Sequence, residues 1–385
     1  MSLPDWIGYC TNVHAGANLA ETEANLAQHA VRVRELISPG DPMGVGLWLS
    51  ATTAQQLRDE ARLARFREFL QENQLTPYTL NGFPYGNFHQ AVVKHAVYEP
   101  TWCDPLRLQY TLDLATILDQ LLPPGEEGSI STLPLAWGDP PLNEEKYAAA
   151  VANLVALTNE LAKLEEATGR LIYVCIEPEP GCAIDTTTDM IDFFQRRLFP
   201  AGDPALLSRH IRVCHDVCHA AVMCEDQSAV LSQYAAAGIG VGKVQISSAI
   251  EIDFESLDNA ERQASIRQLK QFAEDRYLHQ TTVQSPSGAW RRYDDLPDLL
   301  SQAGDSPTGT WRIHFHMPIY LDAFGLLGTT QSQILDLLRQ RELLAPIKHF
   351  EVETYAWTVL PNELRHDELA VGIAKEIDWL KRQMR

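Results

Sequence analysis

Short, continuously apolar runs alternate along this chain with longer segments in which apolar residues recur at helical spacing. The run at 171–176 is typical of a strand that is buried on both faces, because it offers no polar face to solvent. The segment at 54–72 instead carries its apolar residues at the spacing of an amphipathic helix. The predicted strands lie at 6–14, 44–49, 78–83, 129–135, 171–176, 211–215, 243–246, 311–316 and 350–354. The predicted helices lie at 19–36, 54–72, 105–122, 144–168, 187–198, 227–236, 259–276 and 369–384.

Strand alternates with helix through most of the chain, which predicts a parallel sheet covered by helices. The strands begin roughly every 30–50 residues, the length of a strand–helix unit, so the expected fold is an α/β (β/α)8 TIM barrel. The alternation breaks at 250–312, where a hairpin is expected from the extended runs at 277–283 and 290–293. The strand at 311–316 is one more than a barrel takes, and we assign it to an elaboration between strands seven and eight. One domain is expected over 1–385, with 250–312 as the insertion.

Polar residues end several of the predicted buried strands: Glu177, Asp216, Gln245 and Glu353. In a (β/α)8 barrel the carboxyl ends of the strands meet at one mouth, where catalytic groups gather. Carboxylates crowded there repel one another, so a divalent cation is the natural neutraliser. Oxygen ligands favour Mg, Mn or Co, and imidazole moves the preference toward Zn. The alternative is that these residues are separate helix caps or loop acids.

Histidines accompany this pattern. His219 follows Asp216 by three residues, so the two face the same way if a helix begins there. His314 and His316 are two apart on a predicted strand and therefore point to one face, where they could bind substrate or complete a metal site. The alternative for His219 is a structural role, and the alternative for His314 and His316 is a polar outward face of the strand.

Further residues stand at or just after the ends of other predicted strands, where they would line the mouth and orient a polyol substrate. They are His14, Asn81, Tyr85, His89 and Trp137. Their alternative role is that of ordinary loop residues.

Composition narrows the function class. The chain has 385 residues, 45% of them apolar, and a net charge of −20, which argues against nucleic acid or an anionic membrane as a partner. No stretch approaches the roughly 20 apolar residues of a spanning helix, and the first residues lack the pattern of a secretory leader. The seven cysteines include no CxxC pair, so reduced thiols in the cytoplasm are expected. No phosphate-binding loop, dinucleotide fingerprint or nucleophile elbow occurs.

Three phrases of the sequence resemble the xylose-isomerase-like TIM-barrel superfamily, which includes sugar isomerases, epimerases, dehydratases and an endonuclease branch. They are Ile176-Glu177-Pro178, Asp216-Val217-Cys218-His219-Ala220 and Val352-Glu353-Thr354. The resemblance implies that Glu177, Asp216, Gln245 and Glu353 form a metal quartet and that His219 contacts substrate or a further metal. Gln245 departs from the more common histidine. The phrases at 79–86, 129–135 and 314–318 are also similar to a bacterial group called metabolite traffic protein EboE.

The resemblance implies a metal-dependent isomerase or epimerase that acts on a sugar or polyol-like small molecule through an enediolate. Glu177 and Glu353 are then the expected catalytic pair, with His219, His14, Asn81, Tyr85 and His314 around the substrate and His316 as an additional metal ligand. A dehydratase on the same scaffold is an alternative, and so is a non-catalytic metabolite-binding protein. Relatives of this kind assemble as dimers or tetramers, so a homo-oligomer is compatible with this interpretation.

Overall fold

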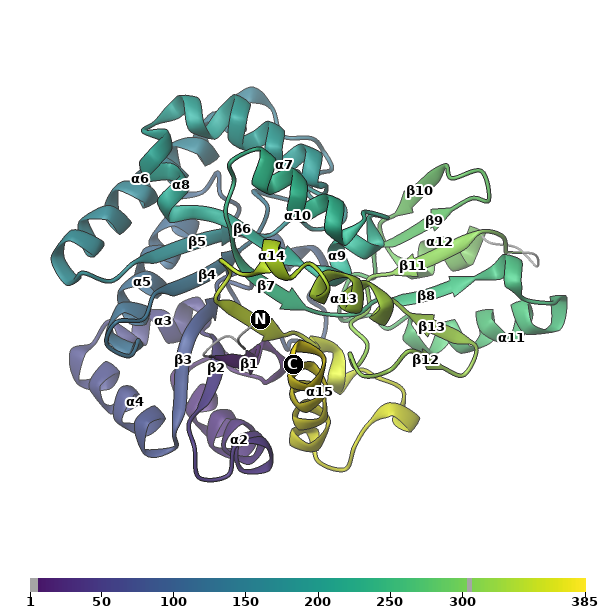
Figure 1. Ribbon diagram of the computed structural model, residues 1–385, viewed down its shortest axis with the longest axis horizontal. Helices are drawn as coiled ribbons and strands as arrows, with labels where there is room; N and C mark the ends of the chain where they lie inside the picture. The colour runs from purple at the N-terminus through teal and green to yellow at the C-terminus, as the bar shows by residue number, and fades with distance from the viewer. Residues whose placement is uncertain (1–5, 303–306) are drawn as a thin grey trace.

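Eight parallel strands form a barrel in the computed structural model, which describes residues 6–302 and 307–385 (Figure 1). The strand order is β1-β14-β7-β6-β5-β4-β3-β2, and a parallel bridge between Cys10 and Gly46 joins the two ends of this sheet. The predicted (β/α)8 architecture is therefore confirmed. The barrel strands are β1 (Ile7–Tyr9), β2 (Met43–Trp48), β3 (Leu75–Asn81), β4 (Gly128–Thr132), β5 (Ile172–Ile176), β6 (Ile211–Asp216), β7 (Val241–Ile246) and β14 (His349–Val352).

Helices surround the barrel, as Figure 1 shows. Most begin at a side-chain cap; Asp104 accepts from the Leu106 N–H and Pro105 follows it, which stabilises the first turn of α5. The predicted helix at 19–36 is divided by a π-helical turn at Leu26–Ala30. The outer helices are α1 (Leu19–Asn25), α2 (Val31–Ile37), α3 (Ala51–Leu57), α4 (Glu60–Glu72), α5 (Pro105–Leu121), α6 (Glu144–Thr168), α7 (Thr187–Phe193), α8 (Pro204–His210), α9 (Val217–Val222), α10 (Gln227–Ala236), α13 (Gln331–Leu338), α14 (Arg341–Leu344) and α15 (Leu369–Met384).

A second sheet stands beside the barrel, at the right of Figure 1. Its strands pair antiparallel in the order β10-β9-β11-β8-β13-β12, so the elaboration expected after strand seven is present. The predicted hairpin is β9 with β10, in which Trp290 pairs with Gln284. The elements here are β8 (Ile250–Asp253), α11 (Asn259–Leu269), β9 (Thr281–Gln284), β10 (Trp290–Tyr293), α12 (Leu296–Gln302), β11 (Thr310–Ile313), β12 (Ala323–Phe324) and β13 (Leu327–Thr329).

The chain leaves the barrel for the second sheet and returns to it at a single point. The Thr330 N–H donates to the Ala249 carbonyl at 2.9 Å, and the Ala249 N–H donates to Thr330 Oγ1 at 2.8 Å. The sheet thus extends past the expected limit of 312. In addition, β11 ends at Ile313, so His314 and His316 do not lie on a strand as predicted but on the irregular segment that follows it.

The barrel interior contains a fully buried ion pair. Lys243 Nζ on β7 lies 2.6 Å from Glu351 Oε2 on β14, and both side chains have no exposed surface. Gly46 on β2 makes room for this pair, because a Cβ at that position would lie 1.3 Å from Glu351 Oε1. The parallel pairing of β7 with β14, which are neighbours in the barrel, brings the two side chains together.

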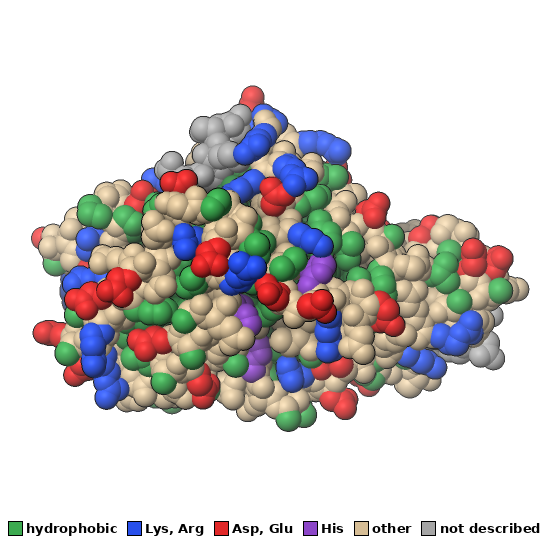
Figure 2. Space-filling model, turned by 90° about the horizontal axis from the view of Figure 1, so that it is seen from below, with side chains coloured by type: hydrophobic (Ala, Val, Ile, Leu, Met, Phe, Trp, Pro, Cys, Tyr) green, Lys and Arg blue, Asp and Glu red, His purple; other side chains and the backbone are tan. Residues whose placement is uncertain are grey.

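The outer surface carries charges of both signs. On the face shown in Figure 2, acidic and basic side chains are interspersed, and hydrophobic side chains lie singly or in small groups among them. Within 6–302 and 307–385, the structure contains no helix with the length and apolar character needed to span a bilayer. Residues 1–5, on which the expectation about a leader rests, lie outside the described ranges.

Candidate functional site

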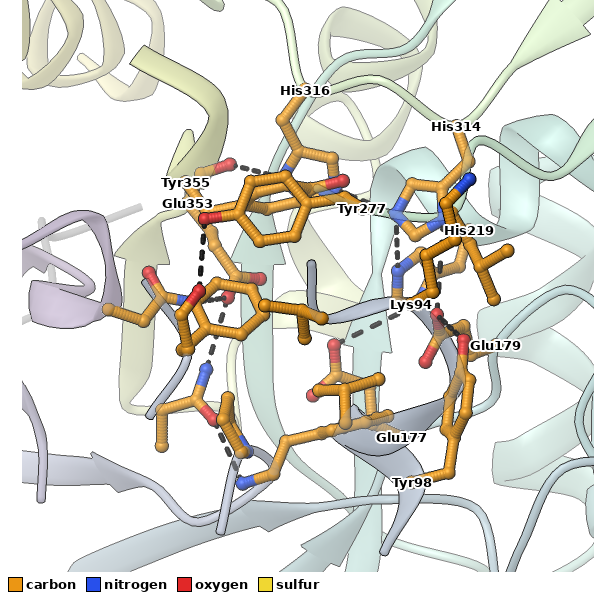
Figure 3. A pocket seen from close by; sticks show the side chains of 18 residues that line it. Lys94, Tyr98, Glu177, Glu179, His219, Tyr277, His314, His316, Glu353 and Tyr355 are labelled. Carbon is orange, nitrogen blue, oxygen red and sulfur yellow. Dashed lines mark hydrogen bonds and ion pairs between the residues drawn. The ribbon is translucent and has the colours of Figure 1, made fainter. Parts of the chain in front are cut away.

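A cavity opens at the carboxyl ends of the barrel strands, between the barrel and the segments that enter and leave the second sheet. It contains roughly 560 Å³ of empty space, with the open solvent at its mouth included. Figure 3 shows acids, imidazoles and aromatic rings around the cavity. Its lining is Asn12, Asn81, Phe83, Pro84, Phe88, Val93, Lys94, Val97, Tyr98, Glu177, Glu179, His219, Tyr277, Leu278, His314, His316, Glu353 and Tyr355.

Three of the four predicted strand-end ligands converge here. Glu177 follows β5, Asp216 ends β6 and Glu353 follows β14, and one ligand oxygen from each lies within 4.8 Å of the others. All three are at most 5% exposed. Asn12 and Asn81 donate to Glu353 Oε1 at 2.7 and 3.0 Å and so fix its orientation.

The carboxylate cluster has features that fit a divalent cation. Glu177 Oε2 and Asp216 Oδ2 are buried, and neither finds a hydrogen-bond partner among the described residues. Burial raises the pKa of Glu177 and of Glu353 well above the ordinary value, and the neighbouring carboxylates raise each further. An unpartnered buried carboxylate is costly, and a cation that shares its oxygens removes that cost. Glu177, Asp216 and Glu353 would hold such an ion.

Gln245, the fourth predicted ligand, lies on β7 in register with Asp216 on one side and Glu351 on the other. Its side chain is fully buried, and within the described part of the chain neither its amide oxygen nor its amide nitrogen has a hydrogen-bond partner. An unsatisfied carboxamide in a barrel interior is uncommon, because it loses its hydrogen bonds to water without replacement. The strand register places Gln245 next to Asp216, and its role as an additional oxygen ligand stays a prediction.

Three histidine rings meet at the upper right of Figure 3. The Nε2 atom of His314 lies 3.2 Å from that of His219 and 3.3 Å from that of His316. Burial, and then the neighbouring imidazoles, lower the pKa of His314 well below its ordinary value. Burial also lowers the pKa of His316, to about 4. Both of these rings are therefore neutral at pH 7.

The other ring nitrogen of each histidine, Nδ1, lies within hydrogen-bond distance of an oxygen acceptor. His219 Nδ1 lies 2.9 Å from the Pro178 carbonyl and His316 Nδ1 lies 2.7 Å from the Glu353 carbonyl. His314 Nδ1 lies 2.8 Å from Gln280 Oε1. Gln280 is itself oriented, because its amide nitrogen donates to the Tyr98 hydroxyl and to Glu179 Oε1. Since an oxygen of this kind only accepts, each Nδ1 carries the proton.

Glu179 is a cavity residue that the strand-end pattern did not single out. It lies two residues beyond Glu177, is 6% exposed, and accepts from the Tyr98 hydroxyl at 2.7 Å. One of its oxygens lies within 4.8 Å of nitrogens of both His219 and His314. The sequence signal was the second acid of Glu177-Pro178-Glu179, directly after a buried strand. Asn12 and Tyr98 gave no comparable signal, because their segments carry no strand-end acid.

Aromatic rings form the roof of the cavity. Phe88, Tyr277 and Tyr355 come from segments after β3, before β9 and after β14, and they pack around one another. Their ring centroids lie 4.9 Å apart for Phe88 and Tyr277, 5.7 Å for Phe88 and Tyr355, and 5.0 Å for Tyr277 and Tyr355. The roof therefore joins three distant parts of the sequence.

A buried carboxylate on α15 anchors two of the segments that carry site residues. Glu376 accepts from Thr354 Oγ1 at 2.6 Å and from Trp357 Nε1 at 2.9 Å, both just after Glu353. It also accepts from the Ile319 N–H at 3.1 Å, three residues after His316. The helix thereby holds the segments after β14 and β11 in one arrangement.

Six predicted site residues lie outside the cavity lining: Asp216 and Gln245 of the predicted metal quartet, and His14, Tyr85, His89 and Trp137 of the residues expected to line the mouth. His14 Nε2 is 2.8 Å from the Tyr9 hydroxyl, and its ring stacks on that of His29 at 4.7 Å. The ring of Tyr85 packs edge-on against Tyr110, with centroids 5.0 Å apart. In contrast, Asn81, His219, His314 and His316 all line the cavity, as Glu177 and Glu353 do.

Comparison by sequence identifies no relative: no protein-family model matches the chain, and no curated protein matches it either. Solved structures do match over nearly its full length. The chain is similar to the probable 3-DHS dehydratase AsbF involved in petrobactin synthesis from Bacillus anthracis, with 11% identity, 98% of each chain covered and a TM-score of 0.47. It is similar to a xylose isomerase domain protein from Alicyclobacillus acidocaldarius subsp. acidocaldarius, with 13% identity, 98% of each chain covered and a TM-score of 0.46.

A third similar structure is the IOLI protein with a binding zinc atom, with 13% identity, 98% of this chain and 96% of that chain covered, and a TM-score of 0.42. These likenesses are too distant to assign an activity. The barrel is established by the strand order and register of this chain itself. The resemblance to the EboE group stays a prediction.

Proposed function

We propose that this protein is a divalent-cation-dependent isomerase or epimerase that acts on a sugar or polyol-like small molecule. The observation that carries the proposal is the set of three buried carboxylates, Glu177, Asp216 and Glu353, at the carboxyl ends of the barrel strands. Glu177 and Asp216 each have an unpartnered oxygen, and Glu177 and Glu353 line the cavity. The resemblance of their sequence context to the xylose-isomerase-like superfamily supports the same reaction class. The phrases at 79–86, 129–135 and 314–318, which are similar to the EboE group, support a role in a secondary-metabolite pathway.

A divalent cation, when bound, would supply charge neutralisation and polarisation of a substrate carbonyl or hydroxyl oxygen. The protein's own groups would move the proton. Glu177 and Glu353 stand on strands β5 and β14, three places apart in the barrel order, so they approach a bound substrate from different sides. In the proposed reaction one carboxylate removes a proton from carbon and gives an enediolate. The other carboxylate returns a proton to the neighbouring carbon or to the opposite face of the same carbon.

Asn12 and Asn81 would keep Glu353 aimed at the substrate. Because both amides donate to the same oxygen, the other carboxylate oxygen is the one left for proton transfer. Positioning of this kind contributes to rate, since a misplaced base loses alignment with the C–H bond.

The cavity's charge favours an uncharged substrate. Glu177, Glu179 and Glu353 all face it, while the one cationic side chain in the lining, Lys94, has its ammonium 2.5 Å from Asp295 Oδ2. An anionic substrate would therefore find no unpaired cationic side chain in this lining. The aromatic roof instead suits the C–H face of a ring, with hydroxyl groups turned toward the floor. Neutral ketoses and cyclic polyol ketones are the substrates to test.

Exchange of carbon-bound hydrogen in D₂O tests the proposal directly. The wild-type protein, loaded with Mn²⁺, is incubated with a panel of neutral ketoses and inososes, and NMR follows the loss of the C–H signal. We expect exchange with at least one compound and its abolition in Glu353→Gln. Glu165→Gln on α6, which makes the same chemical change on the outer surface, is the matched control and should keep full exchange.

The outcomes separate the candidate functions. Full exchange in Glu353→Gln would refute the assigned role of that carboxylate. Appearance of enone absorbance would show that the intermediate loses water, which is the dehydratase reaction. Tight retention of a compound with no exchange and no product would show a binding protein.

A further inference from the structure

We propose that His89 is a positioning residue that acts on Glu353 through the backbone of Asn12. The inference rests on the proposed function, because it takes Glu353 as a metal ligand and base. It assigns a role to a side chain that lies outside the cavity lining. It also makes the orientation of the carboxylate depend on the loop at 82–93 that follows β3, since this loop carries His89.

The two amides that orient Glu353 are held in different ways. Asn81 is the last residue of β3, where the barrel ladder holds it, and its Oδ1 accepts from the Phe83 N–H at 3.0 Å. Asn12 instead lies in the middle of a three-residue 3₁₀ turn, Thr11–Val13. The hydrogen bonds of such a turn are few and have poorer geometry than those of an α-helix. The direction of the Asn12 side chain therefore depends on contacts from outside the turn.

Two contacts hold this turn from outside. The Trp48 N–H on β2 donates to Thr11 Oγ1 at 2.8 Å. His89 Nε2 lies 2.7 Å from the Asn12 carbonyl oxygen, and because a carbonyl only accepts, Nε2 carries the proton and donates it. The Asn12 side-chain amide in turn donates to Glu353 Oε1 at 2.7 Å. Two consecutive hydrogen bonds therefore connect the His89 ring with the carboxylate.

The His89 ring is itself held in place. It is half-buried, and its centroid lies 6.2 Å from that of Trp48 and 5.8 Å from that of Phe88, against which it packs edge-on. Its backbone N–H donates to Asn87 Oδ1 at 2.9 Å. Burial lowers the pKa of His89, so the ring is neutral at pH 7 and has one N–H, which it gives to Asn12.

The loop at 82–93 also reaches the roof of the cavity. Phe88 directly precedes His89, and its carbonyl accepts from the Tyr277 hydroxyl at 3.2 Å. One loop thus joins the aromatic roof to the turn that contains Asn12. Whatever holds the roof closed therefore also holds Asn12 where its amide orients Glu353.

Mn²⁺ affinity tests the proposal without reference to activity. Calorimetric titration of the metal-free, full-length protein with MnCl₂ compares the wild type with His89→Phe, which keeps a flat ring and removes the donor. We expect His89→Phe to bind Mn²⁺ about tenfold more weakly, because loss of a group that orients a metal ligand typically costs about 10–100-fold in affinity. His89→Gln, whose amide can place a donor near the position of Nε2, should restore most of the affinity. His29→Phe, which replaces another half-buried ring outside the cavity, is the matched control and should bind as the wild type does.

A double-mutant cycle tests the path through Asn12. Asn12→Leu removes the amide that donates to Glu353 and should weaken Mn²⁺ binding by about 10–100-fold. Adding His89→Phe to Asn12→Leu should cause no further loss, because the ring then has no amide to position. A ring that only stabilised the fold would cause the same loss in both backgrounds. Circular dichroism and thermal unfolding show which variants are folded, and His89→Leu or Asn12→Ala replaces one that is not.

The outcomes separate this role from the proposed function. Wild-type Mn²⁺ affinity in His89→Phe, with binding lost in Glu177→Gln, would overturn the positioning role and leave the proposed function intact. Equal losses in His89→Phe and His89→Gln, or additive losses in the double variant, would show that the ring acts by packing and would also overturn the role. No Mn²⁺ binding by the wild type would overturn both the positioning role and the carboxylate site.

Discussion

The buried carboxylate of Glu376 makes a prediction about stability that is independent of any ligand. Burial raises its pKa to about 7, against an ordinary value of 4.5, even though three hydrogen bonds favour the charged form. In the unfolded chain Glu376 ionises at its ordinary pKa, so between pH 4.5 and 7 the unfolded state releases a proton that the folded state retains. Stability from this group is complete below about pH 4.5 and is lost as pH rises through about 7.

The magnitude follows from the two pKa values. At about 1.4 kcal/mol per pKa unit, the difference between 4.5 and about 7 corresponds to roughly 3 kcal/mol. Glutamine keeps the size of the side chain and removes the titration. We therefore expect Glu376→Gln to be less stable than the wild type at pH 4.5, because an amide hydrogen then faces one of the three donors. That deficit should shrink by roughly 3 kcal/mol by pH 8.

Urea unfolding of the wild type and of Glu376→Gln at pH 4.5, 5.5, 6.5 and 8 measures the difference in their free energies of unfolding. Ionisable groups that both chains contain contribute equally to the two values, so their effects cancel in this difference. Glu165→Gln, on the outer surface, controls for loss of a charge and should differ from the wild type by a nearly constant amount over this range. A Glu376→Gln deficit that stays constant from pH 4.5 to 8 would refute the reasoning, since it would mean that Glu376 is ionised throughout.

Three further predictions concern the barrel interior and the metal. Gly46→Ala should destabilise the fold by about 3 kcal/mol or more in urea unfolding, because the new Cβ would overlap Glu351; a neutral effect would contradict the described packing. Lys243→Met should cost about 3–5 kcal/mol by the same assay, because it leaves Glu351 buried and unpaired. Lys243→Met/Glu351→Leu should recover most of that loss, and no recovery would argue against a simple ion pair. Mn²⁺ at about 100 times its Kd should stabilise the wild type by about 2.7 kcal/mol and Glu177→Gln by much less, with EDTA as the reversal; equal shifts would argue against the carboxylate site.

The fold could be predicted from the sequence because barrel strands are buried on both faces and therefore appear as unbroken apolar runs. The same logic identified Glu177, Asp216 and Glu353, since parallel strands bring their carboxyl ends to one mouth. It could not determine where side chains beyond the strand ends point. His14 follows β1 closely, yet it turns toward Tyr9 and His29.

Other features depend on contacts between distant segments. In the sequence, Lys243 is a charged residue at the start of a predicted strand. Its place inside the barrel against Glu351 depends on the pairing of β7 with β14. Similarly, the orientation of His314 depends on Gln280, which lies 34 residues earlier in the chain. The sequence also did not predict that the chain becomes irregular after β11, because the apolar residues around His314 and His316 are typical of a strand.

The mutual hydrogen bonds of Ala249 and Thr330 bring the two ends of the segment at 250–329 side by side on the barrel. This segment contributes Tyr277, His314 and His316 to the cavity, whereas the carboxylates stay with the barrel. Because its ends lie side by side, a segment of different length or sequence can be exchanged there without moving the ends of β7 and α13. Exchange of this segment in a single genetic step would replace Tyr277, His314 and His316 and would leave the carboxylates and the roof residues Phe88 and Tyr355 in place.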